Sequence, residues 1–225
     1  MKTALAFVFG IAFMASGSAQ AALIITGVVD GPRSGGLPKA IELFATSDIA
    51  DLSIYNVETP NNGGVPTGAE FALTGSVLAG DFLYIASEAT EFANYFGFAP
   101  DFTGVIASIN GDDNVILYQN GVTIDQFGQV GVDGSGTAWE YTDGFAYRVN
   151  GTGPDPVFVL TNFTYSGIDA LDPQGATGVN GDAGITVPFG TFTAVAVPEP
   201  SSMAALAVVG IGGVVARRRR KVAKA

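Results

Sequence analysis

The 225-residue sequence contains no cysteine and no histidine. Without cysteine there is no disulfide framework and no thiolate chemistry. Without histidine the chain lacks the usual general base and the commonest transition-metal ligand. No histidine is present to activate a serine, which argues against serine-based hydrolysis. These two absences indicate that the protein is not an enzyme of the common nucleophilic classes, and no catalytic residue set is expected.

Positive charge is nearly absent from the middle of the chain. Between residues 22 and 198 the only basic residues are Arg33, Lys39 and Arg148, against twenty acidic ones, which gives this part a formal charge of −17. So acidic a surface repels nucleic acid, and it repels anionic polysaccharide unless divalent cations bridge the two. No nucleic-acid partner is therefore expected.

A three-part pattern closes the chain. It begins with the short motif Val197, Pro198, Glu199 and Pro200, and the 16 residues Ser201–Ala216 that follow carry no charge. As a helix this run would be about 24 Å long, short for a membrane span, and flanking basic side chains can make up part of the difference. The basic cluster that follows is Arg217, Arg218, Arg219, Arg220 and Lys221. Such a cluster stays on the cytoplasmic side, so the rest of the chain is expected across the membrane.

This ending closely resembles the PEP-CTERM sorting signal of bacteria that produce extracellular polysaccharide. The resemblance implies processing near the motif by an exosortase-type transpeptidase. Until then, the C-terminal helix would hold the chain in the membrane. After processing, the protein would be released or attached outside the inner membrane. A simple C-terminal membrane anchor is the alternative interpretation.

The first residues of the chain have the features of an export signal. Lys2 supplies a positive start, Ala4–Ala15 is apolar, and Ala19-Gln20-Ala21 is a small-x-small cleavage site. Signal peptidase is therefore an expected partner, acting at Ala19 and Ala21. Removal of the signal peptide leaves a body that is long enough for one domain with a substantial core.

The body reads as all-β, because short apolar runs alternate with turns rich in Gly, Asp and Asn. The expected strands are residues 23–29, 40–44, 51–57, 70–73, 82–86, 105–109, 114–118, 122–125, 145–149 and 157–164, with a helical stretch at 88–97. Asn120-Gly121 between two of these runs predicts a hairpin with a two-residue primed turn. Residues 169–184 read as loop, and 185–196 as a last strand or a spacer.

From Leu23 to Thr164 the body resembles the lamin-tail domain. The most specific residues are the run Asn110–Tyr118, the turn Asn120-Gly121 and the run Ile124–Gly128; Lys39–Leu43, Asp51–Ser53, Phe71–Leu73, Ala79–Ile85, Gly136–Trp139 and Arg148 also match. The resemblance implies an immunoglobulin-like β-sandwich that serves as an interaction module. Bacterial relatives often accompany secreted nucleases or phosphatases, but no part of this chain remains to form such a domain.

Two groups of residues are candidates for ligand chemistry. Asp112, Asp113 and Asp133 place oxygen ligands in turns, which suits calcium, although the same residues cap turns routinely. Trp139, the only tryptophan, is a candidate platform for stacking sugars, or a core residue. Glu140 and Asp143 beside it are a weak candidate pair for glycoside hydrolysis.

The sequence therefore predicts a signal peptide (1–21), a lamin-tail-like β-sandwich (22–170), a Gly/Asp-rich loop and spacer (171–196) and a sorting signal with a transmembrane helix (197–225). We expect an exported, non-enzymatic protein in the cell envelope or the exopolysaccharide matrix, where it would act as a matrix or adhesion component. A polysaccharide or an envelope protein is the expected partner. A calcium-assisted carbohydrate-binding module is the alternative, and a secreted hydrolase is a distant third. No cofactor is expected, calcium being the one candidate.

Overall fold

The structure is a computed structural model, and it describes residues 21–68 and 70–195. Four features predicted from the sequence lie outside these residues: the signal peptide up to Gln20 with Ala19 of its cleavage site, the motif Val197–Pro200, the helix 201–216 and the basic cluster 217–221. Among the residues that are described, no helix is long and apolar enough to cross a membrane.

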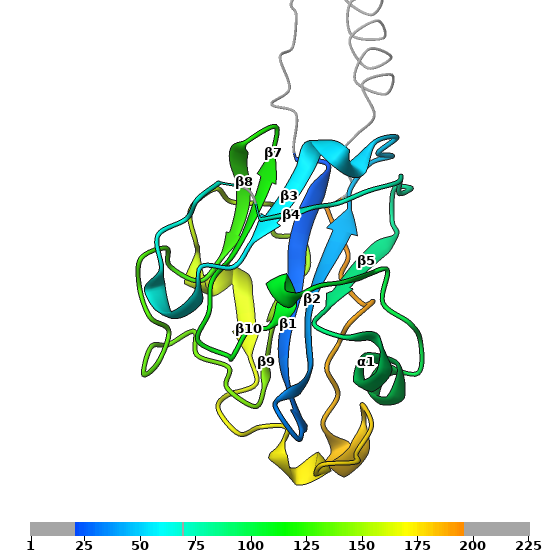
Figure 1. Ribbon diagram of the computed structural model, residues 1–225, viewed down its shortest axis with the longest axis vertical. Coiled ribbons are helices and arrows are strands. Elements are labelled where there is room, and N and C mark those ends of the chain that lie inside the picture. Colours follow the sequence, from blue (N-terminus) through cyan, green and yellow to red (C-terminus); the bar gives the residue numbers. More distant parts are fainter. Residues whose placement is uncertain (1–20, 69, 196–225) are drawn as a thin grey trace, which may run out of the picture.

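Within the residues that the structure describes, ten strands form two sheets (Figure 1). The larger sheet has the order β10-β9-β1-β2-β5-β6. Its strands are β1 (Leu23–Arg33), β2 (Leu37–Ala45), β5 (Phe82–Ala86), β6 (Phe102–Thr103), β9 (Phe145–Arg148) and β10 (Phe163–Tyr165). Adjacent strands of this sheet are antiparallel, except for the short parallel pair β5–β6.

The smaller sheet has the order β4-β3-β7-β8 and is antiparallel throughout. Its strands are β3 (Tyr55–Glu58), β4 (Phe71–Ala72), β7 (Val115–Gln119) and β8 (Val122–Phe127). The predicted hairpin is the β7–β8 pair. Asn120 and Gly121 have φ values of 51° and 75°, as a primed two-residue turn requires.

The main core lies between the two sheets. The larger sheet contributes mainly aliphatic side chains from β1, β2 and β5, and the smaller sheet contributes residues such as Val57, Leu117 and Phe127. A register shift in β1 between Ile25 and Gly27 changes which side chains face this core, so that Ile25 and Val28 both point inward. The continuous apolar run at the start of β1 is explained by burial on both faces of the sheet.

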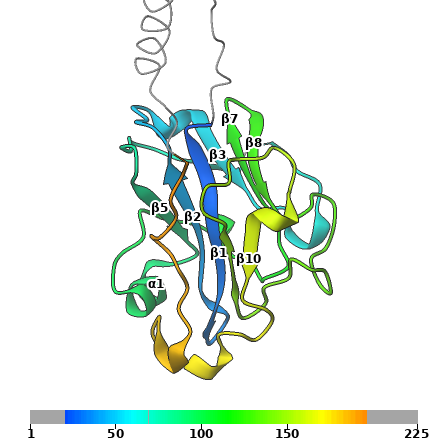
Figure 2. The same cartoon turned by 180° about the vertical axis from the view of Figure 1, so that it is seen from behind.

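The outer face of the larger sheet is also covered. Helix α1 (Ala89–Phe96) packs Phe92 and Tyr95 against it, and the segment 185–195 crosses the same face (Figure 2). Val187 and Phe192 of this segment are buried, the latter against Phe44 at a ring distance of 5.3 Å. We call residues 185–195 the C-terminal strap. It contains no strand, so the last strand considered at 185–196 is not formed over its described part.

Short 3-10 helices replace parts of three predicted strands. They are η1 (Leu52–Ile54), η3 (Val105–Ala107) and η4 (Leu160–Asn162); three others lie in loops, η2 (Asn61–Gly63), η5 (Asp172–Gln174) and η6 (Asp182–Gly184). The prediction of a strand at 105–109 was therefore wrong, and those at 51–57 and 157–164 were too long. At 105–109 the backbone hydrogen bonds are local, because the N–H groups of Ala107 and Ser108 donate to the carbonyl oxygens of Gly104 and Val105. At 157–164 the local N–H to C=O bond from Asn162 to Val159 forms the 3-10 turn in place of a strand.

The two ends of the described chain lie at the same end of the sheets (Figures 1 and 2). Ala21 and Ala22 accept hydrogen bonds from Thr46, just after β2. Thr193 is held by Asn150 and Gly151, just after β9. Helix α1 and the loops around Gly36 and Asp172 lie toward the opposite end.

Candidate functional site

A buried lysine forms the first polar centre, beneath the β1–β2 turn. Lys39 is directly opposite Asp30 in the strand register, and its Nζ donates to Asp30 Oδ1 at 2.6 Å. The same Nζ donates to Ile109 O at 2.8 Å and to Asn110 Oδ1 at 2.9 Å. Burial raises the pKa of Asp30 to about 6, although the Lys39 ammonium acts in the opposite direction. We call Asp30, Lys39 and Asn110 the Lys39 centre.

A buried ion pair joins the two sheets. Arg148 in β9 donates from Nη2 to both carboxylate oxygens of Asp125 in β8, at 2.7 and 2.6 Å. Both side chains are essentially inaccessible to solvent. Asp125 also accepts from the backbone N–H groups of Ile25 and Asp155. The guanidinium lies over the ring of Phe163, 4.5 Å from its centre, so every face of this pair is occupied by protein.

A buried glutamate fixes the C-terminal strap. Glu42 in β2 points to the outer face of the larger sheet, where it accepts from Thr26 Oγ1 at 2.6 Å and from Tyr147 Oη at 3.0 Å. It also accepts from the backbone N–H of Gly190 in the strap. The Tyr147 hydroxyl in turn accepts from the N–H groups of Thr191 and Phe192. Burial raises the pKa of Glu42 to about 7, against the effect of these hydrogen bonds.

Each of the three aspartates proposed for calcium accepts at least one hydrogen bond from a protein donor. Asp113 is fully buried and accepts from the backbone of Asn62 and of Asn110, one through each oxygen. Asp133 accepts from the backbone of Ser135, whose hydroxyl donates to Asp112 Oδ2. Within residues 21–68 and 70–195, no three acidic side chains converge in a way that could hold a metal ion.

One oxygen of this region has no partner among the described residues. Asp112 Oδ1 is buried without a hydrogen bond, and so is the hydroxyl of the fully buried Tyr141. Burial raises the pKa of both Asp30 and Asp113, and the charge of the nearby Lys39 ammonium acts in the opposite direction on each. A resident ammonium opposes the binding of a second cation. This arrangement argues against the calcium interpretation.

Trp139 is a core residue, with only 4% of its surface exposed. Its ring meets those of Phe127 and Phe158 edge to face, with centres 6.0 and 6.1 Å apart. A sugar-stacking platform needs an exposed ring face, so the burial of Trp139 argues against that role. The aromatic cluster instead holds the loop 128–139 against β8.

Of the two carboxylates beside Trp139, that of Glu140 has structural partners. Glu140 accepts from the N–H of Gly136 at 2.6 Å and from Thr142 Oγ1 at 3.0 Å, which closes its own loop. Asp143 has a positive φ of 45°, and its N–H faces Asp30. Burial and the charges of Asp172 and Asp169 raise its pKa. The Glu140 carboxylate is therefore held within its own loop, whereas the hydrogen bonds of Asp143 are made by its backbone.

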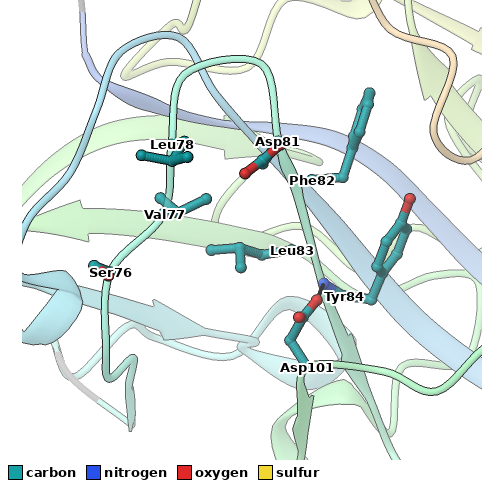
Figure 3. Close-up of a pocket in the computed structure, with 8 residues that line it drawn as sticks. All are labelled: Ser76, Val77, Leu78, Asp81, Phe82, Leu83, Tyr84 and Asp101. Carbon is teal, nitrogen blue, oxygen red and sulfur yellow. Dashed lines mark hydrogen bonds between the residues drawn. The ribbon is translucent and has the colours of Figure 1, made fainter.

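An open hollow of about 460 Å³ lies at the edge of the larger sheet (Figure 3). Val77 and Leu83 face each other across it, and Asp81 and Asp101 flank it, while Phe82 and Tyr84 point to the other side of β5. Asp101 is already bound to the backbone of Tyr84. The lining of the hollow is therefore mixed, with apolar side chains beside polar and acidic groups.

The Lys39 centre and the Asp125–Arg148 pair were missed as functional or structural features in the sequence. The signal that could have found Lys39 is how few lysines the chain contains. Lys39 is the only lysine between Lys2 and Lys221, and it adjoins an apolar run. A charged residue inside such a run is almost never buried unless it is paired. Its partners could not be identified, because Asn110 is distant in sequence.

Comparison with known proteins identifies one segment of the chain. A family model described as the PEP-CTERM protein-sorting motif matches residues 196–220. The predicted sorting motif is thereby confirmed, and it implies an exported protein that is processed by exosortase. No curated protein matches the chain. No solved structure matches it either.

Proposed function

We propose that this chain is a non-enzymatic exported protein whose two-sheet domain is an interaction module of the cell envelope or the exopolysaccharide matrix. The observation that carries the proposal is the sorting motif at residues 196–220, which begins directly after the last residue of the strap. A folded body joined to such a motif needs no further anchor. In this proposal the body presents a binding surface, and the tail determines where it does so.

We also propose that the body is an immunoglobulin-like sandwich of the lamin-tail type. Its two antiparallel sheets face each other across one core, and the residues that resemble the lamin-tail family form its central strands. Lys39–Leu43 lies in β2, and the runs from Asn110 to Gly128 contain the β7–β8 hairpin. The buried Asp125–Arg148 pair joins two further positions of that resemblance.

The interaction surface in this proposal is acidic. Of the three basic side chains of the body, Lys39 and Arg148 are buried and Arg33 is paired with Glu91, which leaves the acidic groups to dominate the surface. A surface of this sign favours a basic or neutral partner and disfavours anionic polymers. A basic envelope protein or a neutral polysaccharide therefore fits better than nucleic acid.

The test is the mass and location of the protein in its own host, with and without exosortase. We expect the extracellular form to end near the Val197–Pro200 motif when exosortase is present. Without exosortase, the full-length C-terminus should stay with the inner membrane. Any mass remaining on the new C-terminus would identify an attached partner.

A matched pair of variants separates the motif from its surroundings. Replacing Pro198 and Pro200 by alanine should block processing, whereas replacing Pro188, inside the strap, should leave processing intact. A full-length C-terminus in the membrane of both host strains would make the tail an ordinary anchor and would contradict the proposal. Recovery of an enzymatic activity from the purified body would contradict its non-enzymatic part.

A further inference from the structure

The Lys39 centre contains the three groups needed to form an amide between side chains. Nζ of Lys39 is a nitrogen nucleophile, the side-chain amide of Asn110 is an acyl donor 2.9 Å away, and Asp30 is a carboxyl group 2.6 Å from the same nitrogen. Lys39 and Asp30 are 9% and 3% exposed, a rare degree of burial for a lysine. A salt bridge requires only Lys39 and Asp30, so it does not account for the position of Asn110 beside the same nitrogen.

We propose that Lys39 and Asn110 form an intramolecular isopeptide bond, with Asp30 as the catalytic acid and base. The Lys39 ammonium gives one proton to the Asp30 carboxylate, and the neutral amine attacks Cγ of Asn110. Asp30 returns the proton to the amide nitrogen, which leaves as ammonia and carries away the remaining proton as ammonium. The new Nζ–Cγ bond replaces the C–N bond of the asparagine amide, so no oxidant or co-reactant is needed.

The surroundings favour this exchange. Backbone close to Gly36 covers the centre, because a Cβ at Gly36 would lie 2.5 Å from Asp30 Oδ1 and 2.7 Å from Lys39 Nζ. Burial favours the neutral form of the Asp30 carboxyl group over its carboxylate. The raised pKa of Asp30, about 6, agrees with a carboxyl group that can hold a proton there. Asn110 lies on the exposed side of the centre, which gives ammonia a way out.

The bond would link the two sheets. Lys39 belongs to β2 of the larger sheet, and Asn110 lies in the loop before β7 of the smaller sheet, 71 positions away. Closing a loop of this length restricts the unfolded chain much as a disulfide does. An exported chain without cysteine would gain by this route a covalent link that needs no oxidising step.

Trypsin digestion followed by mass measurement under denaturing conditions tests the proposal on the full protein. We expect the cleavage after Lys39 to be blocked, so that residues 34–39 and 40–148 remain one species, lighter than its sequence by one ammonia, about 17 Da. Fragments 34–39 and 40–148 recovered separately, at their sequence masses, would overturn the proposal.

The mass alone is not sufficient, because Asn110 precedes Gly111. Attack of the Gly111 amide on Cγ of Asn110 would also release ammonia, but it would leave Lys39 free for trypsin. A lighter fragment 40–148 that separates from 34–39 would therefore also overturn the proposal.

Four variants distinguish a covalent role from a structural one. Lys39→Arg keeps the charge beside Asp30 and should abolish the joined species, as should Asp30→Asn and Asn110→Ala. Asn110→Asp should still form it, now by loss of water, with the same final mass as the wild-type product. A joined species in Asp30→Asn would overturn the catalytic role of Asp30, and its absence in Asn110→Asp would count against the exchange at Cγ.

Discussion

Arg148 shows how much one side chain contributes to the interface between the sheets. We expect Arg148→Met to lower the free energy of unfolding by about 3–5 kcal/mol, because it leaves the buried carboxylate of Asp125 without its counter-charge. Urea denaturation of both proteins measures the difference. Val65→Ala, at a side chain that is 86% exposed, should change stability by no more than about 0.5 kcal/mol. A loss in Arg148→Met as small as this would mean that the pair is not buried in solution.

Glu42 makes stability depend on pH. Its pKa is raised from 4.5 to about 7 in the folded protein, so folding favours the protonated form. The contribution is complete below pH 4.5 and is lost as pH rises through 7, with a change of about 3 kcal/mol. Asp30 acts in the same direction over a lower range, since its pKa rises from 3.8 to about 6.

The variant Glu42→Gln isolates that contribution. Because glutamine does not titrate, the difference in unfolding free energy between wild type and variant should shift by about 3 kcal/mol between pH 4.5 and pH 8, in favour of the wild type at the acidic end. Denaturant titrations at both pH values provide the measurement. A constant difference would show that Glu42 does not change its protonation on folding.

At the residue scale, the sequence predicted the secondary structure of a residue better than it predicted the burial of its side chain. Glu42 lies in the predicted strand 40–44, but a glutamate in a strand is ordinarily exposed. Its burial depends on the strap, whose Gly190 lies 148 positions further along the chain. Trp139 is the opposite case, since burial is the usual state of a tryptophan and the structure has it so.

Among the elements, the β7–β8 turn offers a clean test of backbone conformation. A Cβ at Gly121 would meet no atom within 4 Å, yet φ there is 75°. Gly121→Ala should therefore cost about 1 kcal/mol of unfolding free energy through backbone strain alone. Val122→Thr, at the exposed neighbouring position, should cost no more than about 0.5 kcal/mol. Equal effects of the two substitutions in thermal denaturation would contradict the primed turn.

The C-terminal strap is predicted to be part of the folded domain. Phe192→Ala should lower the unfolding free energy by about 3 kcal/mol, because the ring is buried against Phe44 on the outer face of the larger sheet. Val195→Ala, in the same segment but exposed, should have little effect. If both substitutions are neutral by chemical denaturation, the segment behaves as a spacer.

The success of the element predictions follows the strength of the local signals. The limits of β5 and the turn at Asn120-Gly121 were predicted correctly because alternation and turn chemistry agree there. Helix α1 was also anticipated, and Glu88 and Gly97 cap its two ends. The segment 105–109 was not predicted correctly. Its apolar residues are the exposed Val105 and the buried Ile106, Ala107 and Ile109, and so short an apolar run does not distinguish a strand from a helical turn.

The whole molecule is strongly acidic, and its response to salt should be general. Screening of the acidic surface should raise the melting temperature as ionic strength increases. Calcium and magnesium at the same millimolar concentration should have equal effects, because no three acidic side chains converge to hold a metal ion among the described residues, and Asp112, Asp113 and Asp133 each accept a hydrogen bond from the protein. Differential scanning calorimetry in the two chlorides is the measurement. A calcium-specific increase would revive the metal site.

The sequence predicted the architecture of the whole only in outline. All-β character and the sorting motif followed from short patterns that each lie within a few residues of one another, whereas the two-sheet sandwich was expected only from the lamin-tail resemblance. The links between the sheets did not follow from such patterns, since Asp125–Arg148 and Lys39–Asn110 join residues that only the completed fold brings together. Long-range pairing of charged side chains leaves no periodic signal in a single sequence.

The shared exit of both chain ends has a mechanical consequence. Because residues 21 and 195 lie at one end of the sheets, the body could complete its folding while the segments before and after it were both still held by a bilayer. A pulling force on these two segments would act on β1 and on the strap. The end with α1 would hang furthest from the lipid, so a partner approaching from outside the cell would meet that end first.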